Sequence, residues 1–216
     1  MSYLGKVVPG GPPEVRELAH LIVTKVSVGP MDNNAYLLRC RSTGEELLID
    51  AAAEPSRLIG LVGDGPLRMI VTTHRHADHW GALEEVARLT GAVTVAHPAD
   101  APGITVPTQQ PVSDDDEVRL GDVALRVLHL PGHTPGSVAL LYDDPQGMPH
   151  LWTGDSLFPG GPGKTTPETF PILMRVLEEK VFGALPDETW VYPGHGDDTV
   201  LGNERPHLAQ WWARGW

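Results

Sequence analysis

Residues 73–79 form the densest group of side chains that can bind metal ions. They read Thr-His-Arg-His-Ala-Asp-His, so histidine and aspartate occupy four of the seven positions. Residues two apart in a loop that leaves a strand lie on the same side, and we expect His74 and His76 to bind one cation. Asp78 and His79 begin the next predicted helix and are expected to reach a second cation. Imidazole and carboxylate without a thiolate suit zinc, iron or manganese.

Three further residues of ligand type, His133, Asp155 and His195, each follow a predicted strand in a turn rich in glycine or proline. Glycine beside such a residue permits unusual dihedrals and close backbone approach. Taken singly, each of the three is ordinary in a structural loop. In this order behind the first cluster, they indicate one site built from several strand ends. The three turns are residues 131–136, 153–156 and 192–196.

The hydrophobic pattern predicts the elements that must position these side chains. Short apolar runs bounded by turn residues predict strands, and apolar residues three and four apart predict helices. Their order indicates a layered fold that mixes strands and helices. The predicted strands are residues 21–28, 35–40, 46–50, 68–72, 123–128, 138–142, 150–153 and 190–192, and the predicted helices are residues 55–62, 83–89, 170–184 and 203–214.

Length and composition predict one globular domain over residues 1–216. Apolar residues make up 41% of the chain and charged residues 20%, which is the balance of a folded protein and not of a disordered one. Within this domain we expect residues 1–18 to form an irregular N-terminal arm. The helix predicted at residues 203–214 would be the last element of the domain.

Charge and cysteine content narrow the class of protein. The formal net charge of −12 argues against binding to a phosphate backbone, and hence against nucleic-acid partners. No stretch has the roughly 18–20 apolar residues that a membrane span needs, and the N-terminus lacks the apolar core of a signal peptide. Cys40 is the only cysteine, so an intrachain disulfide is excluded. Together these features predict a cytoplasmic protein.

The ordered set of motifs resembles the metallo-β-lactamase-fold superfamily, over roughly residues 21–195. The resemblance implies a four-layer αβ/βα sandwich, an α+β fold with the site at one edge of two facing sheets. It also implies the ligand sets of two divalent ions, zinc foremost, with iron or manganese as alternatives. His74, His76 and His133 would bind one ion; Asp78, His79 and His195 would bind the other; and Asp155 would bridge both.

Within that superfamily the chain is most similar to glyoxalase II, the hydroxyacylglutathione hydrolases. Residues 153–158 resemble that family's bridging-aspartate loop, and Lys164 occupies the position of the lysine that contacts the glutathione part of the substrate. Arg75 stands where the family often has histidine, and Thr165 and Thr166 stand where it has an aromatic residue. Because only 21 residues follow His195, we expect the family's helical C-terminal domain to be missing or reduced to one helix. A thioester of another small thiol therefore remains an open alternative to a glutathione thioester.

The resemblance implies a metal-dependent hydrolase, a binuclear thioesterase acting on a small-molecule thioester. Two cations that share one water lower its pKa to about 7, and the bridging hydroxide would attack the substrate carbonyl. Asp78 is expected to orient that hydroxide as the catalytic residue, and a thiolate leaves without a strong general acid.

Three alternatives stay open at this point. A persulfide dioxygenase of the same fold would hold a single iron on His74, His133 and Asp155 and consume oxygen. A lactonase would share the whole ligand set. A catalytically silent metal-binding scaffold would be expected to have lost ligands, and none is lost here. The pattern leaves the acyl group, the thiol, the native metal and the oligomeric state open.

Overall fold

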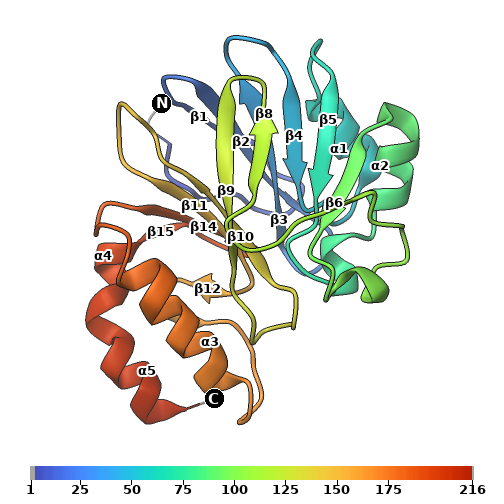
Figure 1. The fold of residues 1–216 in the computed structure, drawn as a ribbon. Coiled ribbons are helices and arrows are strands. Elements are labelled where there is room, and N and C mark those ends of the chain that lie inside the picture. Colours follow the sequence, from blue (N-terminus) through green and yellow to red (C-terminus); the bar gives the residue numbers. More distant parts are fainter. Residues whose placement is uncertain (1–2, 216) are drawn as a thin grey trace.

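The computed structural model describes residues 3–215. Met1 and Ser2, in the predicted N-terminal arm, and Trp216, after the predicted terminal helix, lie outside the described residues. Two β-sheets face each other, and helices cover the outer face of each (Figure 1). This four-layer arrangement confirms the predicted αβ/βα sandwich.

The first sheet comes from the N-terminal half of the chain. Its strands are β1 (Glu14–Glu17), β2 (Leu21–Val28), β3 (Asn33–Cys40), β4 (Glu46–Ile49), β5 (Leu67–Val71), β6 (Val93–Ala96) and β7 (Gln110–Pro111), and its helical segments are α1 (Pro55–Leu61), the 3-10 helix η1 (Ala77–His79), α2 (Leu83–Thr90) and the 3-10 helix η2 (Ala101–Gly103). The strands pair in chain order, antiparallel from β1 to β4 and parallel from β4 to β7. Parallel neighbours need crossover connections: α1 connects β4 to β5, α2 connects β5 to β6, and the segment with η2 connects β6 to β7.

The second sheet comes from the C-terminal half. Its strands are β8 (Glu117–Leu120), β9 (Val123–His129), β10 (Val138–Tyr142), β11 (His150–Gly154), β14 (Trp190–Pro193) and β15 (Thr199–Val200); a separate hairpin comprises β12 (Leu157–Phe158) and β13 (Gly161–Pro162); and the helical segments are α3 (Phe170–Val176), the π-helix η3 (Leu177–Phe182), α4 (Leu201–Glu204), the 3-10 helix η4 (Arg205–His207) and α5 (Leu208–Arg214). The strand order is β15-β14-β11-β10-β9-β8. Only the β11–β14 pair is parallel among these, because α3 and η3 connect the two strands.

Three apolar clusters hold the layers together. The cluster between the sheets includes Leu38 and Trp152, the cluster under α1 and α2 includes Val86, and the cluster under α3 and α5 includes Leu173 and Trp211. Because both faces of each sheet are covered, central strands such as β10 are buried at every position. Such strands read as continuous apolar runs, which is why they are easy to predict.

Among the segments that differ from the expected elements, three concern the N-terminal arm and two of the predicted helices. Residues 14–17, expected in an irregular arm, form the edge strand β1, which pairs antiparallel with β2. That strand has a single apolar residue, so the sequence has no apolar periodicity there that would predict a strand. The helix expected at residues 203–214 begins at Leu201 and is broken by η4, which contains Pro206. The helix expected at residues 170–184 widens into a π-helix after Val176.

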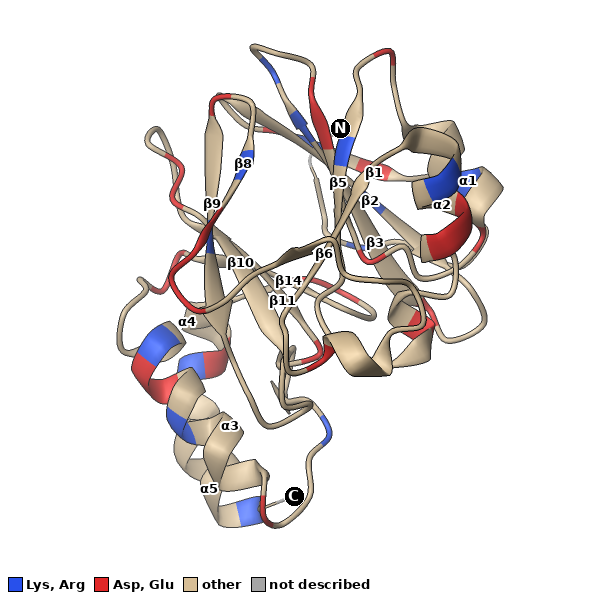
Figure 2. Ribbon diagram, turned by 45° about the vertical axis from the view of Figure 1, so that its right-hand side comes forward, with Lys and Arg blue, Asp and Glu red and all other residues tan. Residues whose placement is uncertain are grey.

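Charged residues lie mainly on the helices, the loops and the strand ends, and few lie along the central strands (Figure 2). The pair of Lys25 and Asp198 is fully buried: Lys25 Nζ lies 2.6 Å from Asp198 Oδ1 and also donates to the carbonyl oxygen of Gly196, at 2.7 Å. No helix within residues 3–215 is long and apolar enough to cross a membrane.

Candidate metal centre

All seven predicted ligands meet where loops of the two sheets face each other. The loop after β5 and the helix η1 supply four of them, and the loops after β9, β11 and β14 supply one each. The loop of the last ligand is joined to the opposite sheet, since the backbone N–H of Asn34 donates to the carbonyl oxygen of Gly194 at 2.7 Å. The candidate ligand residues are His74, His76, Asp78, His79, His133, Asp155 and His195.

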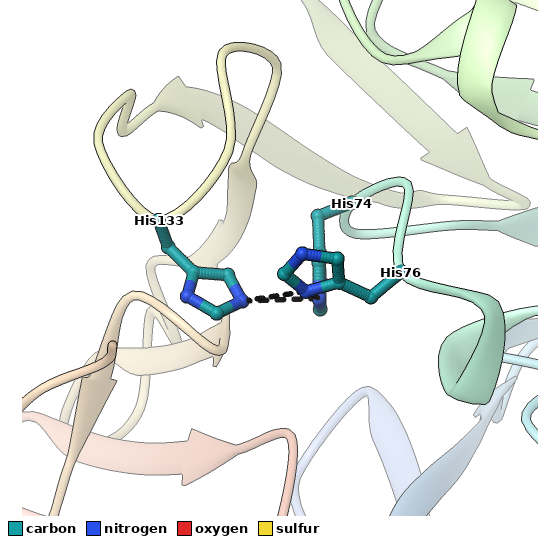
Figure 3. Close-up of side chains that lie close together, drawn as sticks. All are labelled: His74, His76 and His133. Atoms are coloured by element: carbon teal, nitrogen blue, oxygen red, sulfur yellow. Dashed lines mark hydrogen bonds between the residues drawn. The ribbon is translucent and has the colours of Figure 1, made fainter. Parts of the chain in front are cut away.

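The first cluster consists of three histidines whose ring nitrogens converge (Figure 3). His76 Nδ1 lies 3.1 Å from His74 Nε2 and 3.0 Å from His133 Nε2, and the two Nε2 atoms lie 3.3 Å apart. A tetrahedral zinc ion with Zn–N bonds of about 2.1 Å would hold its ligands roughly 3.4 Å apart. The spacing therefore fits one shared ion.

The second cluster consists of Asp78, His79 and His195. The Nε2 atoms of the two histidines lie 3.2 Å apart, and Asp78 Oδ2 lies 3.4 Å from His195 Nε2 and 3.6 Å from His79 Nε2. One carboxylate oxygen and two neutral ring nitrogens make a second set of donors for a divalent ion.

Asp155 lies between the two clusters. Its Oδ1 atom lies 3.3 Å from His79 Nε2, and its Oδ2 atom lies 3.6 Å from His133 Nε2 and 3.5 Å from His195 Nε2. Oδ1 is buried and has no hydrogen-bond partner. An ionised oxygen left in this state is costly unless a cation satisfies it, so the donor set fits bound metal. That these residues bind ions stays a prediction.

Backbone carbonyl groups set the orientation of two of the rings. His133 donates from Nδ1 to the carbonyl oxygen of Lys164 at 2.7 Å, and His195 donates from Nδ1 to the carbonyl oxygen of Met31 at 2.9 Å. Each contact leaves the lone pair on Nε2, the atom that faces the centre. Such contacts beyond the ligands fix the tautomer and the ring orientation in metal sites.

Sequence reasoning did not find two buried side chains that support the second cluster. Asp50 accepts hydrogen bonds from His79 Nδ1 and from both the backbone N–H and the hydroxyl of Thr73, all at 2.8 Å. Asn33 donates to Asp78 Oδ2 at 2.9 Å. The sequence feature that could have identified Asp50 is its place as a polar residue at the end of a buried strand. No sequence feature identifies Asn33, because its role depends on tertiary contacts.

Protonation equilibria also favour a cation. Burial, together with the neighbouring His79, holds the pKa of His74 well below its usual value. Burial alone would raise the pKa of Asp155, but His195 and His79 outweigh it and hold that pKa well below its usual value. Burial likewise disfavours the charged ring of His79, but the carboxylates of Asp50 and Asp155 raise its pKa to about 10. In the absence of metal, a proton on His79 balances these carboxylates, and a cation would take its place.

A cavity of about 650 Å³ adjoins the three-histidine cluster and includes His76 and His133 in its wall. Arg75 and Lys164 bring positive charge to it, and Ile172 brings an exposed apolar side chain. Among the described residues that line it there is no aspartate or glutamate, although the chain carries a net charge of −12. Lys164 thus lies beside the centre, where its predicted role in substrate binding requires it.

Comparison with known proteins confirms the predicted family. Residues 28–195 match the family described as the Metallo-beta-lactamase superfamily. That match covers more than half of the chain and spans all seven candidate ligands. The protein therefore belongs to the metallo-β-lactamase superfamily.

Two relatives illustrate the range of similar sequences. An uncharacterized protein of Aquifex aeolicus is 32% identical over 86% of this chain and 94% of its own length. A hydroxyacylglutathione hydrolase of Rhodospirillum rubrum is 34% identical over 76% of this chain and 62% of its own length. The chain thus spans less than two thirds of that hydrolase.

Two solved structures are similar in fold and sequence. The crystal structure of TTHA1623 in a di-iron-bound form has a TM-score of 0.69 and 33% identity, and the match covers 84% of this chain and 96% of that one. ETHE1 from Myxococcus xanthus has a TM-score of 0.75 and 29% identity, with 86% of this chain and 82% of that one covered. The chain is thus a member of the superfamily that has hydroxyacylglutathione hydrolases among its relatives.

Proposed function

We propose that the protein is a binuclear metallohydrolase that cleaves thioesters of a small thiol, with zinc as its foremost metal and iron or manganese as alternatives. The observation that carries this proposal is the position of Asp155, whose two oxygens face two separate clusters of ligand atoms. A site for one ion needs only one such cluster. The di-iron form of TTHA1623 supports the proposed number of ions.

The protein's own residues would hold and orient the reacting groups. Two divalent ions, when bound, would supply Lewis acidity and lower the pKa of a water to about 7. Asp78 is the residue proposed to orient that water, and Asn33 fixes the carboxylate by donating to Oδ2. A departing thiolate is stable at neutral pH, so no general acid is required of the chain.

The cavity beside the three-histidine cluster supports an acidic substrate. Arg75 and Lys164 line it without a carboxylate among the described lining residues, and Lys164 is the proposed substrate anchor. The hydroxyacylglutathione hydrolase relatives favour a glutathione thioester or a thioester of a similar acidic thiol. We place the enzyme in the cytoplasm, since its single cysteine, Cys40, is free and buried.

A substrate panel tests this function. The purified, zinc-loaded protein would be assayed with acidic thioesters, neutral thioesters and lactones of matched size. We expect kcat/KM for acidic thioesters to exceed that for lactones by at least about 100-fold. Equal or higher values for the lactones would reassign the enzyme to lactone hydrolysis, and no turnover of any ester would remove the proposal.

The likeness to ETHE1 favours one second candidate, a mono-iron persulfide dioxygenase. That enzyme would use His74, His133 and Asp155 for one iron and would not need the cluster of Asp78, His79 and His195. Oxygen uptake in the presence of glutathione persulfide separates the two functions. The thioesterase proposal predicts no uptake by the iron-loaded protein, and stoichiometric uptake would establish the dioxygenase instead.

A further inference from the structure

A buried carboxylate outside the ligand set connects two of the ligand loops. Asp100 lies after β6 and is 1% exposed. Its Oδ2 atom accepts hydrogen bonds from the backbone N–H of Arg75, at 3.0 Å, and from the hydroxyl of Thr134. Its Oδ1 atom accepts from the backbone N–H of Gly136 at 2.9 Å. These donors come from segments about 60 residues apart in the chain.

The three donors flank the ligands of one cluster. Arg75 stands between His74 and His76, and Thr134 directly follows His133. One carboxylate therefore bridges the loop that carries two of the histidines and the loop that carries the third. Asp100 is in none of the groups whose ligand atoms converge, so its effect on an ion would act through the loops.

The close approach of Asp100 to the second loop requires a glycine. A Cβ atom on Gly136 would lie 2.7 Å from the backbone nitrogen of Asp100 and 2.8 Å from its Cβ and Cγ atoms. No side chain fits there without moving the carboxylate. The close approach of Asp100 thus explains why the motif at residues 131–136 ends in a glycine.

Only a carboxylate satisfies these contacts. Three hydrogen-bond donors point at the two oxygens of Asp100. The positively charged guanidinium group of Arg75 is also near, with Nε 3.9 Å from Oδ1. An asparagine would have to turn its NH₂ group toward at least one donor, which leaves two donors facing each other in a buried space.

We propose that Asp100 is a positioning residue that fixes the separation of His74, His76 and His133, and thereby sets the affinity of that cluster for its ion. Asp50 has the corresponding place beside His79 in the other cluster. Loss of such a partner typically lowers metal affinity 10- to 100-fold.

The test measures zinc affinity in two backgrounds, so that each cluster is observed by itself. His195→Ala disables the second cluster and keeps the three histidines, whereas His76→Ala does the reverse. Competition with a chromogenic chelator gives the affinity. Asp100→Asn should weaken zinc binding about 10- to 100-fold in the first background and less than about twofold in the second.

Matched variants separate positioning from general stability. Asp114→Asn also removes a carboxylate that accepts a backbone N–H, that of His129, and it should leave both affinities unchanged. If Asp100→Asn does not fold, Thr134→Val removes one donor and should weaken the same cluster about 3- to 10-fold. Thr134→Ser keeps the hydroxyl and should restore the affinity.

Three results would overturn the inference. The first is an equal loss of affinity in both backgrounds. The second is a lower melting temperature of the metal-free Asp100→Asn protein with unchanged zinc affinity, which is the mark of a purely structural role. The third is a parent protein that binds no zinc, which would also remove the proposed metal centre. The first two results would leave the proposed hydrolase intact.

Discussion

At the scale of single residues, several candidate ligand atoms of the centre have no hydrogen-bond partner outside it. His133 and His195 use one ring nitrogen for a backbone carbonyl and turn the other toward the site. Asp155 Oδ1 is buried and has no hydrogen-bond partner. Lone pairs arranged in this way repel one another unless protons or cations lie between them, so each residue should matter more for metal content than for folding.

Asp155→Ala tests this point. Because the carboxylate faces both clusters and would offset part of the repulsion between two ions, its loss should release at least one ion. Hydrolysis should fall by roughly 100-fold or more. Elemental analysis and steady-state kinetics measure the two effects. The exposed Asp122→Ala variant controls for the loss of one negative charge, and normal metal content with unchanged turnover in Asp155→Ala would refute the bridging role.

Lys164→Ala tests the substrate anchor. Its backbone carbonyl, which holds His133, is retained in the variant, so the metal centre should persist. A contact to a distant carboxylate is equal in ground and transition states, so KM for an acidic thioester should rise about 5- to 30-fold with kcat nearly constant.

Arg88→Ala removes the same charge from the exposed surface of α2 and should have no such effect. The anchor would be disproved by a KM change of equal size for a neutral thioester, or by no change for either substrate.

At the scale of elements, the loops after the strands are as constrained as the strands themselves. Gly132 has a φ of 141°, and a Cβ atom there would lie 2.5 Å from Leu173 Cβ and 2.9 Å from the Leu173 backbone nitrogen at the start of α3. The loop that carries His133 is thus packed directly on a helix. Close backbone packing, in addition to the ligand itself, explains the glycine before the histidine.

Gly132→Ala should therefore lower the free energy of unfolding of the metal-free protein by about 2–4 kcal/mol, through strain and overpacking. Urea denaturation measures the change. Gly60→Ala is the matched control, because Gly60 lies in α1 with no atom near its missing Cβ, and it should be neutral or slightly stabilising. A Gly132→Ala protein as stable as the parent would show that the loop moves freely.

The sequence was sufficient to predict elements that have a strong local signal. β2 and β10 have the predicted bounds, because β10 is a continuous apolar run and β2 is apolar or β-branched at every position except Lys25 and Ser27. β6 and β8 were not predicted: β6 has four residues, and β8 has only two apolar side chains. Short strands of this kind are specified by their neighbours and leave little periodicity of their own.

The candidate site likewise contains residues that the sequence identifies and residues that it does not. The seven candidate ligands follow strand ends in an order that resembles the metallo-β-lactamase superfamily, so this resemblance was enough to select them, and the structure brings them together. Asp50 and Asp100 could not be found in this way, since each acts on segments distant in the chain. The sequence shows which side chains can bind a metal ion, whereas tertiary contacts determine which of them lie together and which residues support them.

At the scale of the whole molecule, the centre joins the two sheets. Loops of the first sheet supply His74, His76, Asp78 and His79, and loops of the second supply His133, Asp155 and His195. A bound ion would therefore connect the two halves of the sandwich. Binding to the folded state alone stabilises it by about 2.7 kcal/mol when the free ligand is at 100 times its Kd.

Metal removal should accordingly lower the melting temperature. At a free zinc concentration of 100 times Kd, we expect the zinc-loaded protein to melt roughly 5–10 °C above the metal-free protein. Differential scanning calorimetry with and without chelator measures the shift, and added zinc should restore it. Coincident transitions would mean that no ion links the sheets.

The most direct test of the central claim is the metal content of the active enzyme. We expect close to two transition-metal ions per chain by elemental analysis of protein that hydrolyses an acidic thioester. Chelation should abolish that hydrolysis, and two equivalents of added metal should restore it. A preparation that hydrolyses the thioester at full rate with no metal bound would contradict the account.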